Sequence, residues 1–144
     1  MIATYDDDQL YCLQTTNVLN LKPDYQSQIS LKYLLALINS SLLNWFFRIS
    51  FPSNNHIASN QLARLPIRVI DKEKDEDISA HNKLVSFVEK ILDLNIKMDS
   101  ASIPREKEMF NRQIDVVDNQ IDKIVFSLYG LAEEEIALVK SDVY

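Results

Sequence analysis

Three aspartates on one predicted helix are the residues whose spacing comes nearest to a metal site. Asp115, Asp118 and Asp122 stand at positions i, i+3 and i+7, so a helix would bring their carboxylates to one face, where they could hold a divalent cation. A row of acidic side chains on a helix is more often only solvated, and no histidine or cysteine lies near them in the sequence. We therefore predict an acidic, solvent-facing surface here and no metal site.

Other residue patterns that support catalysis are missing from the sequence. Two histidines, His56 and His81, together with the lone Cys12 cannot make a closed zinc site. The sequence has no Asp-x-Lys or Glu-x-Lys pair of a metal-dependent nuclease, and no Asn-Pro-Pro-Tyr or Asp-Pro-Pro-Tyr run of an adenine methyltransferase. The single glycine excludes a glycine-rich phosphate loop. We predict that the chain is not an enzyme and binds no cofactor of its own.

Charge is divided unevenly along the 144 residues, whose net charge is −6. Residues 1–70 carry five basic side chains against four aspartates, whereas residues 71–144 carry ten basic against seventeen acidic ones. Between Lys22 and Ile70, Asp24 is the only acidic residue, so a local field that attracts phosphate can exist on an acidic protein. Scattered surface charge is the alternative interpretation of this segment.

Several features of the sequence favour a cytoplasmic protein. The lone Cys12 allows no internal disulfide and fits a reducing compartment. Asp6, Asp7 and Asp8 follow the first methionine closely, which is unlike a signal peptide. The most apolar run, residues 33–47, is interrupted by polar side chains and is too short to cross a bilayer of roughly 30 Å. We therefore expect no membrane association.

The beginning of the chain is predicted to contain short strands, which makes the expected fold class α+β. Residues 2–5 and 10–13, on either side of an aspartate turn, and residues 15–19 have the composition of strands. Strands this short would have exposed edges, so we expect the chain to be the C-terminal part of a larger protein.

A helix and a loop are predicted to follow these strands in a small β/α subdomain. Ser30 can cap a single helix whose apolar face continues to about Phe46. Residues 49–60 lose this periodicity and fill with Ser, Asn and Pro, as in a surface loop, and Pro66 favours an extended segment after it.

The second half is predicted to form a long antiparallel pair of helices. After the charged stretch 71–77, Ser79 is expected to cap a helix to about Met98, and Pro104 to begin a second helix that runs to about Tyr129. Apolar side chains recur at steps of four and three in both helices, at 84, 88, 91 and 98 and at 110, 114, 117, 121, 124 and 128. The two seams should face each other, with Asn95 available to fix their register.

The only glycine, Gly130, is predicted to end the second long helix. It stands where a helix C-cap requires a residue that is free to take a positive φ. Three glutamates at 133–135 suit the first turn of a short last helix, near the positive end of its dipole.

Four stretches of the sequence resemble a known family. They are residues 32–48, 61–67, 81–95 and 112–136, the last reading RQIDVVDNQIDKIVFSLYGLAEEEI. Together they resemble the C-terminal target-recognition region of type IIG and Eco57I-like restriction-modification adenine methyltransferases, whose last domain is similar to the TaqI methylase C-terminal specificity domain. Their order also resembles a type I specificity subunit, in which a recognition domain precedes a long spacer helix.

The resemblance implies a partner and a parent enzyme. It implies that the chain binds double-stranded DNA and works with a methyltransferase domain or subunit that uses S-adenosylmethionine, often with a nuclease domain as well. The catalytic and cofactor motifs of those domains have no counterpart in this chain, which would be a non-catalytic fragment of the prokaryotic defence enzyme.

Within such a region, cations would hold phosphates, while amide and guanidinium groups would read base edges in the major groove. Seven polar residues between positions 32 and 68 are the candidates for DNA contact: Lys32, Arg48, Asn54, Asn55, His56, Arg64 and Arg68. Arg48 and Asn55 are favoured, because a loop after a core helix can project while its base stays rigid. For each candidate the alternative is an exposed polar residue that touches no DNA.

These observations lead to one leading hypothesis and one alternative. We predict a DNA target-recognition fragment, with residues 1–70 as part of the recognition domain and residues 71–144 as a helical spacer that docks on the methyltransferase. The alternative is a protein-interaction or dimerisation module without DNA binding, in which the seams at 84–98 and 110–128 assemble with a second copy.

Overall fold

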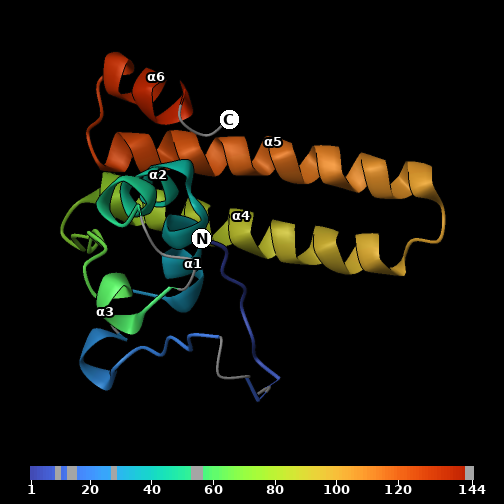
Figure 1. Ribbon diagram of the computed structural model, residues 1–144, viewed down its shortest axis with the longest axis horizontal. Helices are drawn as coiled ribbons and strands as arrows, with labels where there is room; N and C mark the ends of the chain where they lie inside the picture. Colours follow the sequence, from blue (N-terminus) through green and yellow to red (C-terminus); the bar gives the residue numbers. More distant parts are fainter. Residues whose placement is uncertain (9–10, 13–15, 27–28, 53–56, 142–144) are drawn as a thin grey trace.

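The computed structural model is built from helices and connecting segments (Figure 1). It describes residues 1–8, 11–12, 16–26, 29–52 and 57–141. Along these ranges the elements are η1 (Pro23–Tyr25, a 3-10 helix), α1 (Leu31–Asn39), α2 (Ser41–Ser50), α3 (Ser59–Leu62), α4 (Asp75–Ser100), α5 (Pro104–Leu128) and α6 (Glu133–Ser141). No strand occurs among the described residues, so the predicted α+β class, with its N-terminal β/α subdomain, is wrong.

The first residues show why no sheet forms. Met1, Ala3 and Tyr5 are partly buried, whereas Ile2 and Thr4 are exposed, which is the alternation of an extended chain that favoured a strand. The backbone N–H of Ala3 donates to the side-chain oxygen of Asn39 at 2.8 Å, and its carbonyl accepts from the Asn39 amide at 2.9 Å. A side chain therefore satisfies the groups that a neighbouring strand would pair. The predicted strands at 10–13 and 15–19 lie partly outside the described residues.

The predicted single helix after Ser30 is two helices that meet at Ser40. Ser30 caps α1 as predicted, its hydroxyl accepting the N–H of Tyr33 at 3.1 Å. Ser40 has an extended backbone (φ −62°, ψ 151°); its buried hydroxyl accepts from Leu43 N and donates to the Leu37 carbonyl at 2.7 Å. A serine within an apolar repeat can continue a helix or cap a new one, and here it caps α2.

The predicted helical pair is present as α4 and α5, which lie side by side and extend away from the other helices (Figure 1). α5 begins at Pro104 as predicted, but α4 begins at Asp75, four residues before the predicted cap Ser79. Three acidic side chains, Asp75, Glu76 and Asp77, occupy the first turn of α4, where the positive end of the helix dipole stabilises them. The charged stretch that reads as a linker is therefore partly helix.

Gly130 ends α5 as predicted, with φ of +67°. The N–H of Leu131 donates to the Phe126 carbonyl at 3.1 Å, which satisfies an end carbonyl of the helix. The chain then turns back into α6, which packs on α2 and buries Val139.

One hydrophobic core joins the two halves of the chain. α1 packs on α4, and α2 packs on α5 and α6. The largest fully buried apolar side chains come from five helices: Tyr33, Leu37, Leu43, Leu84, Val117, Val125 and Val139. Within this core the seams of α4 and α5 pack on each other, and α4 also packs on α1. In the described part of the chain, no helix is long and apolar enough to span a membrane.

Candidate nucleic-acid interface

A second, smaller core supports the chain between the end of α2 and residue 67. Its buried members are Ile38, Phe47 and Leu65. Partly buried side chains around them include Phe46, Phe51, Ile57, Leu62 and Ile67. This cluster anchors the segment after α2 on α1 and α2, so the polar side chains that the segment carries start from a packed base.

Two of the predicted DNA-contacting residues lie at this end of α2. The ring of Phe51 packs on that of Phe47, with centroids 5.1 Å apart, and the guanidinium of Arg64 lies 5.2 Å from the Phe51 ring centroid. Arg48 stands in the last turn of α2, three residues before Phe51, and is exposed. No described residue forms an ion pair or hydrogen bond with either guanidinium. Two cations at the end of α2 are therefore available to an anionic ligand.

Polar contacts hold the short helix α3 beside the first part of the chain. The Asn17 amide donates to the Ile57 carbonyl at 2.7 Å, and the Ser59 hydroxyl donates to the Asn17 side-chain oxygen at 3.1 Å. Gln61 is buried, and its side-chain oxygen accepts the N–H of Ala58 at 2.9 Å. The predicted loop at 49–60 thus contains a helical turn. Asn17 is not among the predicted site residues, because its partners stand 40 and 42 positions away in the sequence.

Lys32 lies away from the arginines at the end of α2, and α4 already neutralises its charge. Its ammonium donates to the Glu89 carboxylate at 2.7 Å and lies 5.5 Å from the Tyr5 ring centroid. The hydrogen bond to Glu89 is the main cause that raises the pKa of Lys32. A DNA phosphate would have to compete with Glu89 for this cation.

Arg68 is held by its side chain and by its backbone. A terminal guanidinium nitrogen lies 3.2 Å from both carboxylate oxygens of Asp77, which is buried and also accepts the Asp71 N–H at 3.0 Å. That backbone hydrogen bond is the main cause that lowers the pKa of Asp77, and Arg68 lowers it further. Arg68 therefore ties the segment after Pro66 to the start of α4. Asp77 was missed in the sequence because it stands in a run that reads as solvated charge.

Two tyrosines complete this network. The N–H of Arg68 donates to the Tyr129 hydroxyl at 3.1 Å, and that hydroxyl donates to the Pro66 carbonyl at 2.7 Å. The Tyr33 hydroxyl donates to the Arg68 carbonyl at 3.0 Å. The end of α5 thus fixes the backbone on both sides of Ile67. The remaining candidates, Asn54, Asn55 and His56, lie outside the described residues.

The aspartate face of α5 has a structural use. Asp122 accepts hydrogen bonds from the backbone N–H and the hydroxyl of Ser41, at the N-terminus of α2. The pKa of the Asp118 carboxyl is raised to about 6. Partial desolvation of this side chain is the main cause, and the negative charges of Asp122 and Asp115 add to it. Among the described residues, no group of three or more His, Cys, Asp or Glu side chains could hold a metal ion.

Comparison with known families gives a match over the part of the chain that carries Arg48 and Arg64. Residues 1–67 match the family described as the TaqI-like C-terminal specificity domain. The match supports a TaqI-like recognition domain over these residues and a DNA-recognition role in a restriction-modification enzyme; a specificity domain is not catalytic in itself. No curated protein and no solved structure matches the chain.

Proposed function

We propose that this chain recognises the DNA target of a type IIG, Eco57I-like restriction-modification adenine methyltransferase, and that the end of α2 contacts the DNA. The observation that carries the proposal is the specificity-domain match over residues 1–67, since this range includes both Arg48 and Arg64. The methyltransferase, with its S-adenosylmethionine, would belong to another part of the parent enzyme or to a partner subunit.

The chemistry at the end of α2 supports this assignment. Arg48 and Arg64 are exposed and can each present several N–H donors to phosphate oxygens or to a guanine edge. Phe51 lies under the Arg64 guanidinium and limits its freedom, so less side-chain entropy is lost when Arg64 binds. Phe51 itself is held by Phe47 and the smaller core.

The other candidate cations have a supporting part in this proposal. Arg68 and Lys32 are engaged by Asp77 and Glu89 on α4, so they hold the recognition end on the helical pair. The helical pair would then dock on the methyltransferase, with its acidic surface turned away from the phosphates. Acidic side chains repel a DNA backbone, which is why DNA contact is assigned to the end of α2.

Binding to duplex DNA tests the proposal directly. The full chain is titrated against a fluorescent duplex pool of random sequence, and anisotropy is measured at several salt concentrations. Binding should weaken as salt rises, and Arg48→Ala and Arg64→Ala should each reduce the slope of log affinity against log salt by about 1 if the residue holds a phosphate. A residue that reads a base should instead cost about 1–3 kcal/mol on a selected sequence.

A matched cation elsewhere provides the control. Lys107, near the start of α5, is also exposed and unpaired with any described residue, so Lys107→Ala changes net charge equally. It should leave DNA binding near the parental value. The proposal fails if the chain does not bind duplex DNA at low salt, alone or joined to its methyltransferase, or if Lys107→Ala weakens binding as much as Arg48→Ala and Arg64→Ala.

A further inference from the structure

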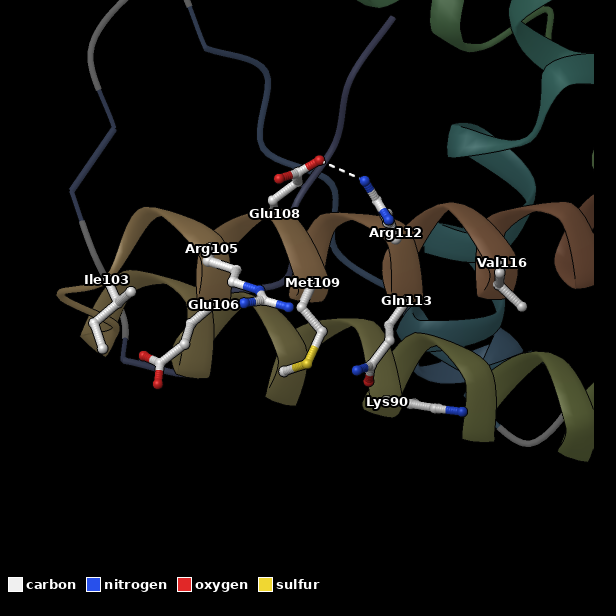
Figure 2. A pocket seen from close by; sticks show the side chains of 9 residues that line it. All are labelled: Lys90, Ile103, Arg105, Glu106, Glu108, Met109, Arg112, Gln113 and Val116. Atoms are coloured by element: carbon white, nitrogen blue, oxygen red, sulfur yellow. Dashed lines mark hydrogen bonds and ion pairs between the residues drawn. The ribbon is translucent and has the colours of Figure 1, made fainter.

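A groove on the exposed side of the helical pair includes neither of the arginines to which DNA contact is assigned. It encloses about 870 Å³ and runs along α5, with Lys90 of α4 at its edge (Figure 2). Three large apolar side chains that line it, Ile103, Met109 and Val116, are 55%, 48% and 58% exposed. Side chains of this kind on one helix face, covered by no other described element, indicate an interaction surface.

Glu106 and Arg112 stand at symmetrical positions about Met109, three residues before it and three residues after it. Arg105 and Gln113 stand four residues before and after it. In Figure 2, Glu106 and Arg112 project from opposite edges of the helix face that carries Met109. A two-fold axis through Met109 would therefore bring Glu106 of each copy to Arg112 of the other.

We propose that this groove binds the same groove of a second copy of the chain, with the two α5 helices antiparallel across Met109. Glu106 of each copy meets Arg112 of the other, and Arg105 meets the side-chain oxygen of Gln113. An interface that uses one patch twice requires such self-complementarity. DNA would leave the apolar floor of the groove unused, and the mixed charges give a purely acidic or basic partner no advantage.

Arg112 can make this contact without losing its present one. One of its terminal nitrogens donates to Glu108 at 2.6 Å, one turn back on the same helix. A guanidinium carries five N–H donors, so other donors remain for Glu106 of the second copy. Met109 contacts its own symmetry mate, and Ile103 approaches Val116.

The dimer is expected to be weak and to separate the recognition ends. About four helical turns of each copy take part, which places the buried area at the low end of specific interfaces. The dimer should therefore be populated only at high protein concentration. Leu128, at the recognition end of α5, lies roughly 29 Å along the helix from Met109 at 1.5 Å per residue. The antiparallel arrangement therefore directs the two recognition ends in opposite directions.

Sedimentation velocity of the full chain, from about 5 to about 500 µM, tests this interface. The parent should shift from monomer to dimer as concentration rises, and Met109→Glu should remain monomeric because it places two carboxylates on the axis. Ile96→Glu, at a position on α4 that is 67% exposed and outside the groove, should dimerise like the parent.

A charge exchange identifies the pairing itself. Glu106→Arg alone and Arg112→Glu alone each bring like charges together and should be monomeric, whereas an equimolar mixture restores both pairs and should dimerise. Circular dichroism of each variant confirms that the helices persist. A parent that is monomeric throughout, a dimer that survives Met109→Glu, or a mixture that does not associate would overturn the inference and leave the groove to another partner. None of these results depends on DNA binding.

Discussion

Replacing Tyr129 by phenylalanine tests whether the helical pair holds the recognition end in place. The substitution removes only the hydroxyl at the end of α5, which accepts from Arg68 N at 3.1 Å and donates to the Pro66 carbonyl at 2.7 Å. The ring keeps its place against the core. Any loss of stability therefore reports these two hydrogen bonds and little else.

The expected magnitude follows from those two bonds. An intramolecular hydrogen bond contributes about 0.5–1.5 kcal/mol net, and a buried donor left without a partner costs more. The bond to Arg68 is partly buried and the bond to Pro66 is exposed, so water can replace the second partner more easily than the first. We expect Tyr129→Phe to lower the free energy of unfolding by about 1–3 kcal/mol.

Equilibrium urea denaturation followed by circular dichroism measures this difference, and Tyr25→Phe is the matched control. Tyr25 lies in η1, is 49% exposed, and forms no side-chain hydrogen bond with a described residue. Its substitution should change the free energy of unfolding by less than about 0.5 kcal/mol. If Tyr129→Phe is as stable as Tyr25→Phe, the network does not join the two halves and the reasoning is refuted.

Two further substitutions test the end of α5 and its acidic face. Gly130→Ala should lower the free energy of unfolding by about 1 kcal/mol, because φ is +67° while no atom lies within 4 Å of an added Cβ. Gly130→Asn should lower it by less, since asparagine tolerates a positive φ better than alanine. Equal stability of the parent and both variants would contradict the idea that the backbone conformation at Gly130 requires glycine. The Asp118 carboxyl has its pKa raised from 3.8 to about 6 on folding, so the parent should lose stability as pH rises from about 4 to about 6, where only the folded state keeps the proton. Asp118→Asn should therefore gain stability over the parent as pH rises through this range, by less than about 1 kcal/mol since the side chain is exposed and screened. A difference that stays constant between pH 4 and pH 7 would exclude this cause.

The long helices could be predicted from the sequence because their signals are local. Pro104 and Gly130 act on the backbone of the residues beside them, and the four-three repeat of apolar side chains continues over several turns. The Ser79 hydroxyl predicts a helix cap at that position, yet α4 begins at Asp75 without any side-chain cap. Favourable charges in its first turn and the burial of Asp77 determine that boundary, and burial depends on the rest of the fold.

The sequence alone could not show whether the predicted strands form, because a strand exists only where a neighbouring strand pairs with its backbone. Residues 1–5 do alternate between partly buried and exposed side chains, but alternation describes any extended chain that lies on a surface. The decisive residue is Asn39, which stands 36 positions away and satisfies both backbone groups of Ala3. No local pattern contains that information, and the same holds for the contact between Asn17 and residues 57–59.

Among the candidate site residues, a similar distinction separates Arg64 from Arg68. Both are arginines of one basic segment, four residues apart. Arg64 lies over an aromatic ring on the surface, whereas Arg68 is paired with a carboxylate from the first turn of α4. Sequence alone weighs them equally, since the difference depends on which element each one faces.

The specificity-domain match ends at residue 67, but the hydrophobic core that holds this segment includes side chains beyond that residue. Ile70 is buried in the core that α1 shares with α4 and α5, and Arg68 is bound by groups from α1, α4 and the end of α5. Without the helical pair, α1 would lose the helix on which it packs. Tyr33 is fully buried and lies against His81 of α4, with ring centroids 5.1 Å apart, so exposing a large apolar side chain of this kind would cost about 1.5–3 kcal/mol. The unit that folds is therefore larger than the segment that resembles known recognition domains. It follows that the position of Arg48 and Arg64 on DNA depends on α4 and α5, although neither helix has to touch a base.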